Sequence, residues 1–268
     1  MALGKINSLI SRYLNSSNQE VKKSEEKLSS GSKLNKTSDD AAGVAIAAKL
    51  ESEAATLEVA NRNIGSGNSA ADIADSALSE ISDMTTRMAE LATQSANGTY
   101  SDEQRSQMKE EYDALAQEAQ RVAQTTEYNG SKVFDEKGVT IQVGNDGSSR
   151  SQIEVSRLDL SKKLEDLSKR DIGTQEGGAN ALDAAASTTG EITALRAQLG
   201  ATVSRLNTAT SNNTTSEVES ISAQSEIRDV KVAEESARNV AANIRRDSSA
   251  AIMAQSNQSA HIVQALLG

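Results

Sequence analysis

Apolar residues recur at helical spacing at both ends of the chain, but each apolar stripe is narrow. Within residues 1–34 the stripe consists of Leu3, Ile10, Leu14, Val21 and Leu28, and Ser17 and Ser24 interrupt it. Within residues 229–268 it consists of Val240, Ile244, Ile252, Ile262 and Leu266. A helix with so thin a stripe cannot form a core alone. Both ends are therefore expected to pack on each other or on neighbouring copies of the chain.

The first connector and the helix after it are marked by turn and capping residues. Residues 31–40 (GSKLNKTSDD) predict a non-helical connector, with Ser38 or Asp39 as the N-cap of the next helix. An Ala-rich helical pattern then covers residues 41–97, where Gly65 and Gly67 are candidate positions for a bend. If unbroken, a helix of this length would extend roughly 85 Å.

The rest of the middle region predicts further helices and one hairpin. Ser101 with Gln104 forms a capping-box pattern that starts a helix reaching about residue 127. Residues 132–156 predict a β-hairpin, because VTIQV and SQIEV alternate on either side of a Gly-Asn-Asp-Gly turn. Residues 158–180 are charged and then Gly-rich, which is typical of a short, flexible surface excursion. Helical spacing resumes at Ala181 and continues to the C-terminus.

Composition favours thin helical bundles over a compact enzyme. The chain has one Phe, four Tyr and no Trp, although aromatic side chains usually supply the bulk of globular cores and the walls of ligand pockets. Small side chains allow helix axes to approach to roughly 8–10 Å. Proline is absent, which permits long helices, and cysteine is absent, which excludes disulfides and thiolate metal sites.

Charge separates the ends from the middle. The net charge of the chain is −10. Residues 1–40 hold seven basic and five acidic residues, and residues 229–268 hold four of each, so both ends are close to neutral and the middle carries the negative charge. A near-neutral segment can self-associate, whereas an acidic one repels nucleic acid and anionic membranes. No apolar run is long enough for a membrane span, and the N-terminus lacks the apolar segment of a cleaved signal peptide. General secretion, nucleic-acid partners and membrane partners are not expected.

The residues that catalysis or metal binding would require are missing from the sequence. His261 is the single histidine, which excludes a His-dependent triad or a two-His metal site within one chain. The glycines do not fit the phosphate-binding patterns GxGxxG or GxxxxGK[ST]. Paired carboxylates are most often helix caps or part of a solvated face. We therefore expect no enzyme activity, no catalytic residues, no metal and no cofactor.

Several longer motifs resemble bacterial flagellin. The N-terminal signature is matched by LSSGSKLNKTSDDAAGVAIAAKL at 28–50, MAELATQSANGTYSDEQR at 88–105 and EYNGSKVF at 127–134. The C-terminal signature is matched by LRAQLGATVSRLN at 195–207, SEIRDVKVAEES at 225–236 and AIMAQSNQSAHIVQALL at 251–267. Order and spacing are retained across nearly the whole chain.

The resemblance implies a mainly α fold: a rod-like bundle of long helices with a small β-hairpin, plus a terminal two-helix coiled coil. Residues 1–40 and 229–268 would form the inner coiled-coil domain, with 31–40 as its connector. Residues 41–228 would form the rod-like outer domain, and 158–180 would stand in place of the variable outer domains of larger flagellins. The ten stripe residues named above would form the inner coiled coil and contact neighbouring subunits.

The resemblance also implies a function and partners. The chain would be the structural subunit that polymerises into the extracellular helical filament for bacterial motility. It would be exported through the flagellar channel without a cleaved signal peptide. Its partners would be further copies of itself, the flagellar export apparatus, an export chaperone, the filament cap and the hook-junction proteins. A host innate immune receptor is a further expected partner; the matching positions are Arg87, Leu91 and Glu111, and Gln94 lies on the same helix and belongs to the expected face.

Two other classes of protein share features with the chain. The hook–filament junction protein shares the terminal signatures but would match less well through 88–134. Within the flagellins, a minor flagellin is a further alternative. A helical signalling hairpin shares the Ala/Ser/Glu richness and the lack of proline. It has no β-hairpin, so VTIQVGNDGSSRSQIEV argues against it.

Overall fold

The computed structural model describes residues 2–134, 138–155 and 160–267, with side chains for 7–134, 138–155, 160–259 and 262. The chain packs as two compact units, one formed by residues 1–53 with 218–268 and the other by residues 54–217. The division into an inner and an outer functional domain stays a prediction.

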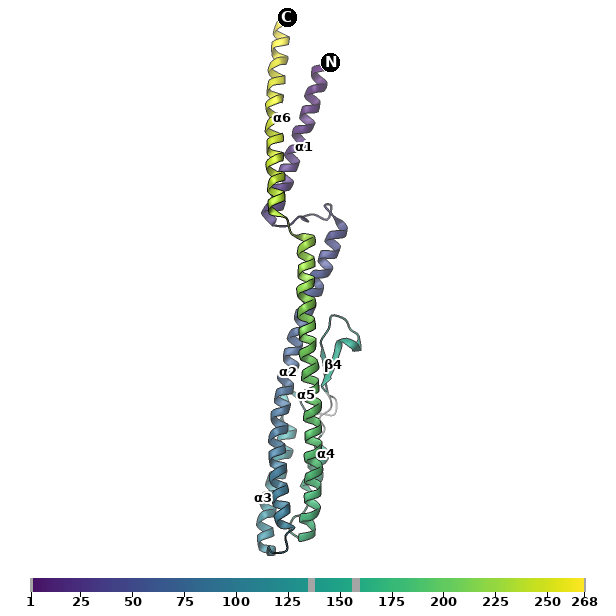
Figure 1. The fold of residues 1–268 in the computed structure, drawn as a ribbon, viewed down its shortest axis with the longest axis vertical. Helices are drawn as coiled ribbons and strands as arrows, with labels where there is room; N and C mark the ends of the chain where they lie inside the picture. Colours follow the sequence, from purple (N-terminus) through teal and green to yellow (C-terminus); the bar gives the residue numbers. More distant parts are fainter. Residues whose placement is uncertain (1, 135–137, 156–159, 268) are drawn as a thin grey trace. The chain divides into compact units, whose positions relative to one another are not determined.

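The first unit is built around the two terminal helices. Helix α1 (Ala2–Ser30) and helix α6 (Val232–Leu267) run side by side in opposite directions (Figure 1). The end of α1 and the start of α6 lie together, and the residues beside them, Ser32 and Asp229, form an isolated antiparallel bridge. The amide of Val230 donates to the carbonyl oxygen of Gly31 over 2.9 Å. Gly31 adopts φ +69°, a left-handed conformation that favours glycine and ends α1.

The N-cap of helix α2 (Ala41–Ser95) lies one residue after Asp39, the later of the two predicted positions. The carboxylate of Asp40, rather than Ser38 or Asp39, accepts a hydrogen bond of 2.9 Å from the amide of Gly43. The helix then continues through Gly65 and Gly67 without interruption. Packing within the units therefore outweighs the helix-weakening effect of these glycines.

Helix α3 (Asp102–Thr125) starts as its sequence predicts. The hydroxyl of Ser101 accepts from the amide of Gln104, and the Gln104 side chain accepts from the amide of Ser101. This reciprocal pair is the predicted capping box. Asp102 and Glu103 in the first turn also lie at the positive end of the helix dipole.

The core of the second unit lies between α2, α3 and the long helix α5 (Gln175–Arg228), which lie side by side in Figure 1. Small side chains occupy many of the contacts, and Ala74, Ala92 and Ala119 are fully buried. Larger buried residues fill the space between the helices; they include Ile64, Leu78, Ile81, Met88, Leu91, Tyr112 and Ile192. The mainly helical fold class predicted from the sequence is confirmed.

Two small hairpins pack beside α2. Strands β3 (Val139–Gln142) and β4 (Gln152–Val155) form the predicted antiparallel hairpin. Ile141 lies opposite Ile153, and both side chains are buried. The short 3-10 helix η1 (Ser149–Ser151) lies in the connection between the two strands. A second hairpin, β1 (Glu127–Tyr128) with β2 (Ser131–Lys132), was not predicted. Asn129 and Gly130 turn between its strands with φ of 51° and 76°, the geometry that an Asn-Gly turn favours.

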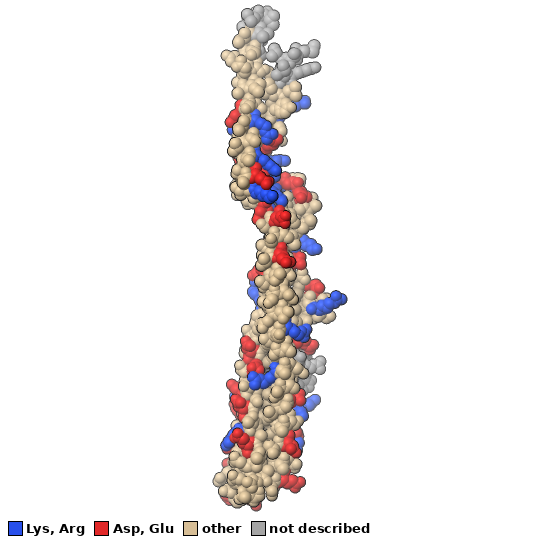
Figure 2. All heavy atoms as spheres, viewed as in Figure 1, with Lys and Arg blue, Asp and Glu red and all other residues tan. Residues whose placement is uncertain are grey.

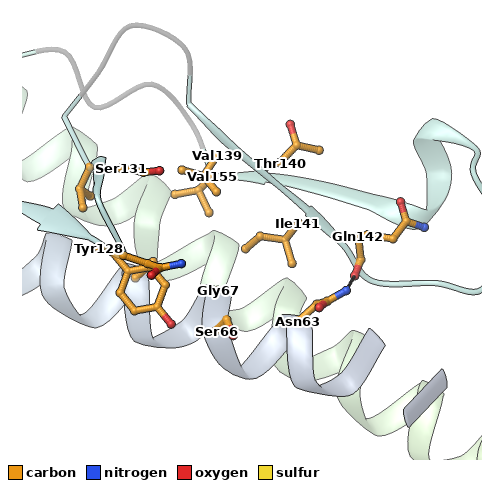
Figure 3. A pocket seen from close by; sticks show the side chains of 13 residues that line it. Asn63, Ser66, Gly67, Tyr128, Ser131, Val139, Thr140, Ile141, Gln142 and Val155 are labelled. Carbon is orange, nitrogen blue, oxygen red and sulfur yellow. Dashed lines mark hydrogen bonds between the residues drawn. The ribbon is translucent and has the colours of Figure 1, made fainter. Parts of the chain in front are cut away.

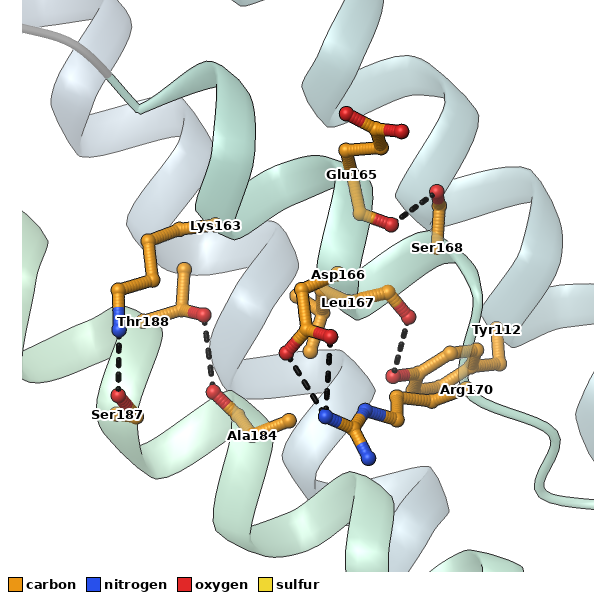
Figure 4. Close-up of polar contacts among 10 residues, drawn as sticks. All are labelled: Tyr112, Lys163, Glu165, Asp166, Leu167, Ser168, Arg170, Ala184, Ser187 and Thr188. Atoms are coloured by element: carbon orange, nitrogen blue, oxygen red, sulfur yellow. Dashed lines mark hydrogen bonds and ion pairs between the residues drawn. The ribbon is translucent and has the colours of Figure 1, made fainter.

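The described part of segment 158–180 is an ordered part of the bundle rather than the flexible excursion expected. Helix α4 (Ser161–Ser168) contacts α3, and its buried residues are Leu164 and Leu167. The hydroxyl of Tyr112 donates to the carbonyl oxygen of Leu167 over 3.2 Å, and Lys163 Nζ donates to the hydroxyl of Ser187 over 3.2 Å (Figure 4). Charged residues made the segment look solvated, but its leucines lie on one face and bury against the core.

Candidate assembly surfaces

The contact between α1 and α6 combines apolar and polar residues on one narrow face. On α1, Val21 is buried, as are the two interrupting serines, Ser17 and Ser24. The other described stripe residues of α1, which are Ile10, Leu14 and Leu28, are half-buried. Among the described side chains of α6, Ala242 and Glu235 are buried. The polar interruptions of the predicted stripe therefore lie inside the helix pair.

Polar contacts cross this seam at three levels. Near the connectors, the hydroxyl of Ser24 donates to the backbone carbonyl oxygen of Glu235 over 3.1 Å. Farther along, Arg245 pairs with Glu20 at 2.8 Å. Toward the chain ends, Asn7 Oδ1 accepts from the hydroxyl of Ser256 over 2.6 Å. The buried hydroxyl of Ser24 is thus paired, in keeping with the rule that a buried polar group without a partner is costly.

The described residues of the predicted α6 stripe are exposed in this chain. The side chains of Val240, Ile244, Ile252 and Ile262 are 55–61% exposed. The expectation that these four residues are buried against α1 of the same chain is therefore wrong, because the residues of α6 that bury against α1 include Glu235 and Ala242 instead. Contacts between these residues and neighbouring subunits stay a prediction. The side chains of the other two predicted positions, Leu3 and Leu266, lie outside the described residues.

The four positions expected to form a receptor-binding face divide between surface and core. Arg87 pairs with Glu111 of α3 at 2.8 Å and with Glu90 at 3.0 Å, and its side chain stays 45% exposed. The hydrogen bonds that Arg87 donates to the carboxylates of Glu111, and then of Glu90, raise the pKa of Arg87 above its ordinary value. Gln94 is exposed, whereas Leu91 is 2% exposed and belongs to the core. Leu91 therefore cannot contribute a surface contact in this conformation.

A groove that the sequence did not indicate lies between α2 and the hairpins (Figure 3). Its volume is 390 Å³, and its walls include Asn63, Ser66, Gly67, Tyr128, Val139 and Ile141. A Cβ atom at Gly67 would lie 2.1 Å from Ile141 Cδ1, so glycine at this position lets β3 approach the helix. The glycine inside a long helical pattern and the Asn-Gly turn are the two signals that could have indicated this packing.

The described surface shows mixed charge and no arrangement typical of a metal site. Acidic and basic side chains are interspersed over the face drawn in Figure 2. Among the described residues, no group of three or more His, Cys, Asp or Glu side chains could hold a metal ion. None of the helices in the described ranges has the length and apolar character to cross a bilayer. The side chain of His261 lies outside the described residues.

Comparison with protein families assigns both halves of the chain. The family model of the bacterial flagellin N-terminal helical region matches residues 6–139, and that of the bacterial flagellin C-terminal helical region matches residues 182–267. The chain belongs to the bacterial flagellin family. The resemblance found in the sequence motifs is confirmed.

Individual relatives agree with this assignment. The flagellin is 34% identical to a flagellin of Halalkalibacterium halodurans, over 91% of each chain. It is 29% identical to a flagellin of Listeria monocytogenes, over 95% of this chain and 94% of the relative. The crystal structure of Bacillus cereus flagellin has the same fold, with a TM-score of 0.52 and 23% identity over 57% of this chain and 88% of the other.

Family membership decides between the classes of function considered from the sequence. The flagellin is a structural subunit of the bacterial flagellar filament, which is an extracellular polymer. The hook–filament junction protein and the helical signalling hairpin are not favoured. Flagellins are structural proteins, which agrees with the expectation that the chain is not an enzyme.

Proposed function

We propose that the flagellin polymerises through its terminal helices and buries the outer face of α6 against neighbouring subunits. The observation that carries the proposal is the exposure of Val240, Ile244, Ile252 and Ile262 on a helix that contacts α1 through other residues. Fully burying a side chain of this kind contributes about 1.5–3 kcal/mol. Obligate interfaces bury roughly 2,000–5,000 Å² and resemble a divided core.

Seeded elongation tests this proposal. Deleting residues 229–268 removes α6, and we expect no filaments by negative-stain electron microscopy. In the full-length chain, Ile244→Asp and Ile252→Asp place a charge on the stripe and should stop elongation. The matched variants Ile244→Val and Ile252→Val keep the stripe apolar and should elongate. Normal filaments from both Asp variants, with unchanged helix content, would show that this face is not an interface.

We further propose export through the flagellar channel without a cleaved signal peptide, with the export apparatus, an export chaperone, the filament cap and the hook-junction proteins as partners. Family membership supports this export route and these partners. The mass of the protein secreted by a flagellated host tests cleavage. We expect the full-length mass, less the initiator Met at most. Loss of a longer N-terminal segment would contradict the proposal.

We also propose that the exposed surface around Arg87 and Glu111 is contacted by a host innate immune receptor. The ion pair supports this because it joins α2 to α3 and stays accessible. Arg87→Ala should weaken signalling in receptor-bearing reporter cells. Arg121→Ala is the matched control, because Arg121 is an exposed arginine that pairs with Glu118 within α3. Equal signalling by the two variants would exclude a specific role for Arg87.

A further inference from the structure

The β3–β4 loop, residues 143–151, is exposed and yet held in one conformation. The amides of Val143 and Gly144 both donate to the carbonyl oxygen of Ser151, over 2.8 and 3.2 Å. Residues 145–150 are nevertheless exposed. The loop thus combines a fixed backbone with an accessible surface, so a partner that binds it has little chain to order.

Two asparagine side chains hold the base of this loop to both long helices of the second unit. Asn213 Nδ2 of α5 donates to the carbonyl oxygen of Val143 over 2.7 Å. Asn63 Nδ2 of α2 donates to the carbonyl oxygen of Gln142 over 3.4 Å (Figure 3). The hairpin therefore projects beside α5 from a fixed base (Figure 1).

Two charged side chains lie in the loop, and they differ in their surroundings. The Oδ1 atom of Asp146 accepts from the amide and the hydroxyl of Ser148, over 3.1 and 2.8 Å. Hydrogen bonds from Ser151 and then from Ser148 lower the pKa of Asp146. Arg150 is exposed, and none of the ion pairs within the described ranges includes it. Arg150 is therefore the charged group that the loop offers to a partner.

A groove of complementary charge lies between α2 and the end of α3. Its volume is 350 Å³, and its lining residues include the carboxylates Asp72 and Glu80 and the apolar residues Ile73, Ala77 and Val122. Ile73 is 38% exposed. The described lining residues include no basic residue and no residue of the β3–β4 loop. The groove offers a guanidinium two carboxylates, and its methylene stem an apolar floor.

We propose that the β3–β4 loop docks into this groove on a second copy of the chain, with Arg150 beside Asp72 and Glu80. Loop and groove are different surfaces, so a copy that gives its loop to one neighbour keeps its groove open for another, as an open polymer requires. The basic residue next to the groove, Arg121, is already paired within α3. The inference rests on the assembly function proposed above and adds a second contact to that of α6.

Cross-linking between copies tests the contact, because the natural chain has no cysteine. One full-length chain carries Ser149→Cys in the loop, and another carries Ser76→Cys in the groove; both positions are exposed. The two chains are mixed, elongated on seeds and oxidised. We expect disulfide-linked dimers from the mixture and none from either chain alone. Ser204→Cys, at an exposed position of α5 outside the groove, replaces Ser76→Cys as the matched control and should give none.

Charge reversal should change the rate of elongation in a defined way. Arg150→Glu brings three carboxylates together and should slow seeded elongation by roughly threefold to tenfold. Adding Asp72→Arg and Glu80→Arg reverses both sides of the contact and should restore the rate. Arg205→Glu is the matched control, because it makes the same change of charge at an exposed position of α5 outside both surfaces and should leave the rate unchanged.

Three outcomes, in variants of unchanged helix content, would overturn the inference: filaments without the mixed disulfide, an unchanged rate in Arg150→Glu, or failure of the full charge swap to restore the rate. The contact through α6 is judged separately by adding Ile244→Asp to both cysteine chains. Filaments that form despite Ile244→Asp and contain the mixed disulfide would contradict the α6 contact and support the docking of the loop. Absence of filaments from the natural chain would contradict both.

Discussion

The start of α5 offers a sharp test of how backbone packing holds the second unit together. A Cβ atom at Gly178 would lie 2.6 Å from the amide nitrogen of Ala96 and 2.9 Å from the carbonyl oxygen of Ala92. Both atoms belong to the backbone at the end of α2 and cannot rotate away. Gly190, in the same helix, is exposed, and its Cβ would have no neighbouring atom within 4 Å. The two glycines are therefore a matched pair.

The expected magnitudes follow from this difference in surroundings. Replacing an exposed helical glycine by alanine gains about 1 kcal/mol of helix propensity, so Gly190→Ala should stabilise the protein by about that amount. Gly178→Ala gains no more than this but adds overpacking, which typically costs about 1–3 kcal/mol. Gly178→Ala should therefore be about 1–3 kcal/mol less stable than Gly190→Ala.

Urea unfolding followed by far-ultraviolet circular dichroism measures the comparison. The midpoint should fall for Gly178→Ala and rise for Gly190→Ala, with the same slope in both variants. If Gly178→Ala proved as stable as Gly190→Ala, the close approach of α5 to α2 would not constrain the fold. A changed slope would instead point to an altered folded or unfolded state.

Two further predictions concern buried polar groups. Arg105 is 5% exposed, and its guanidinium donates to the carbonyl oxygens of Ser95 (2.8 Å) and Asn97. Arg105→Met should therefore lower the free energy of unfolding by about 1–3 kcal/mol, measured by urea unfolding. An unchanged midpoint would contradict this. Burial raises the pKa of Tyr112 to about 12, so its stabilising contribution is present below about pH 10 and is lost as the pH rises toward 12. Tyr112→Phe lacks the hydroxyl that donates to Leu167, and its stability should fall less over that alkaline range; a decline equal to that of the natural chain would refute the assignment.

Local signals in the sequence predicted much of the fold. The capping box at Ser101 and Gln104 satisfies helix-end groups by side chains close in sequence, so it could be recognised without knowledge of the tertiary structure. The β3–β4 hairpin was equally local, since alternation and a turn define it. Helix α4 was missed because it has only two buried leucines, and its charged residues dominate the composition of the segment.

The face by which α6 contacts α1 could not be predicted from periodicity. Helix α6 has two usable faces, and the more apolar one, with Ile244 and Ile252, was assigned to the contact with α1. The actual contact uses small and polar residues such as Ala242 and Ser256, which carry little hydrophobic signal. Choosing between the faces requires knowing the partner, because a chain that assembles has two kinds of neighbour to satisfy.

The division of α6 into a polar inner face and an apolar outer face has a thermodynamic consequence. Polar contacts with α1 contribute little heat-capacity change, whereas burial of Val240, Ile244 and Ile252 would contribute a large negative one. Association through the outer face would then weaken on cooling, as hydrophobic burial does. Temperature would therefore act more strongly on the contacts between subunits than on the pairing of helices within one chain.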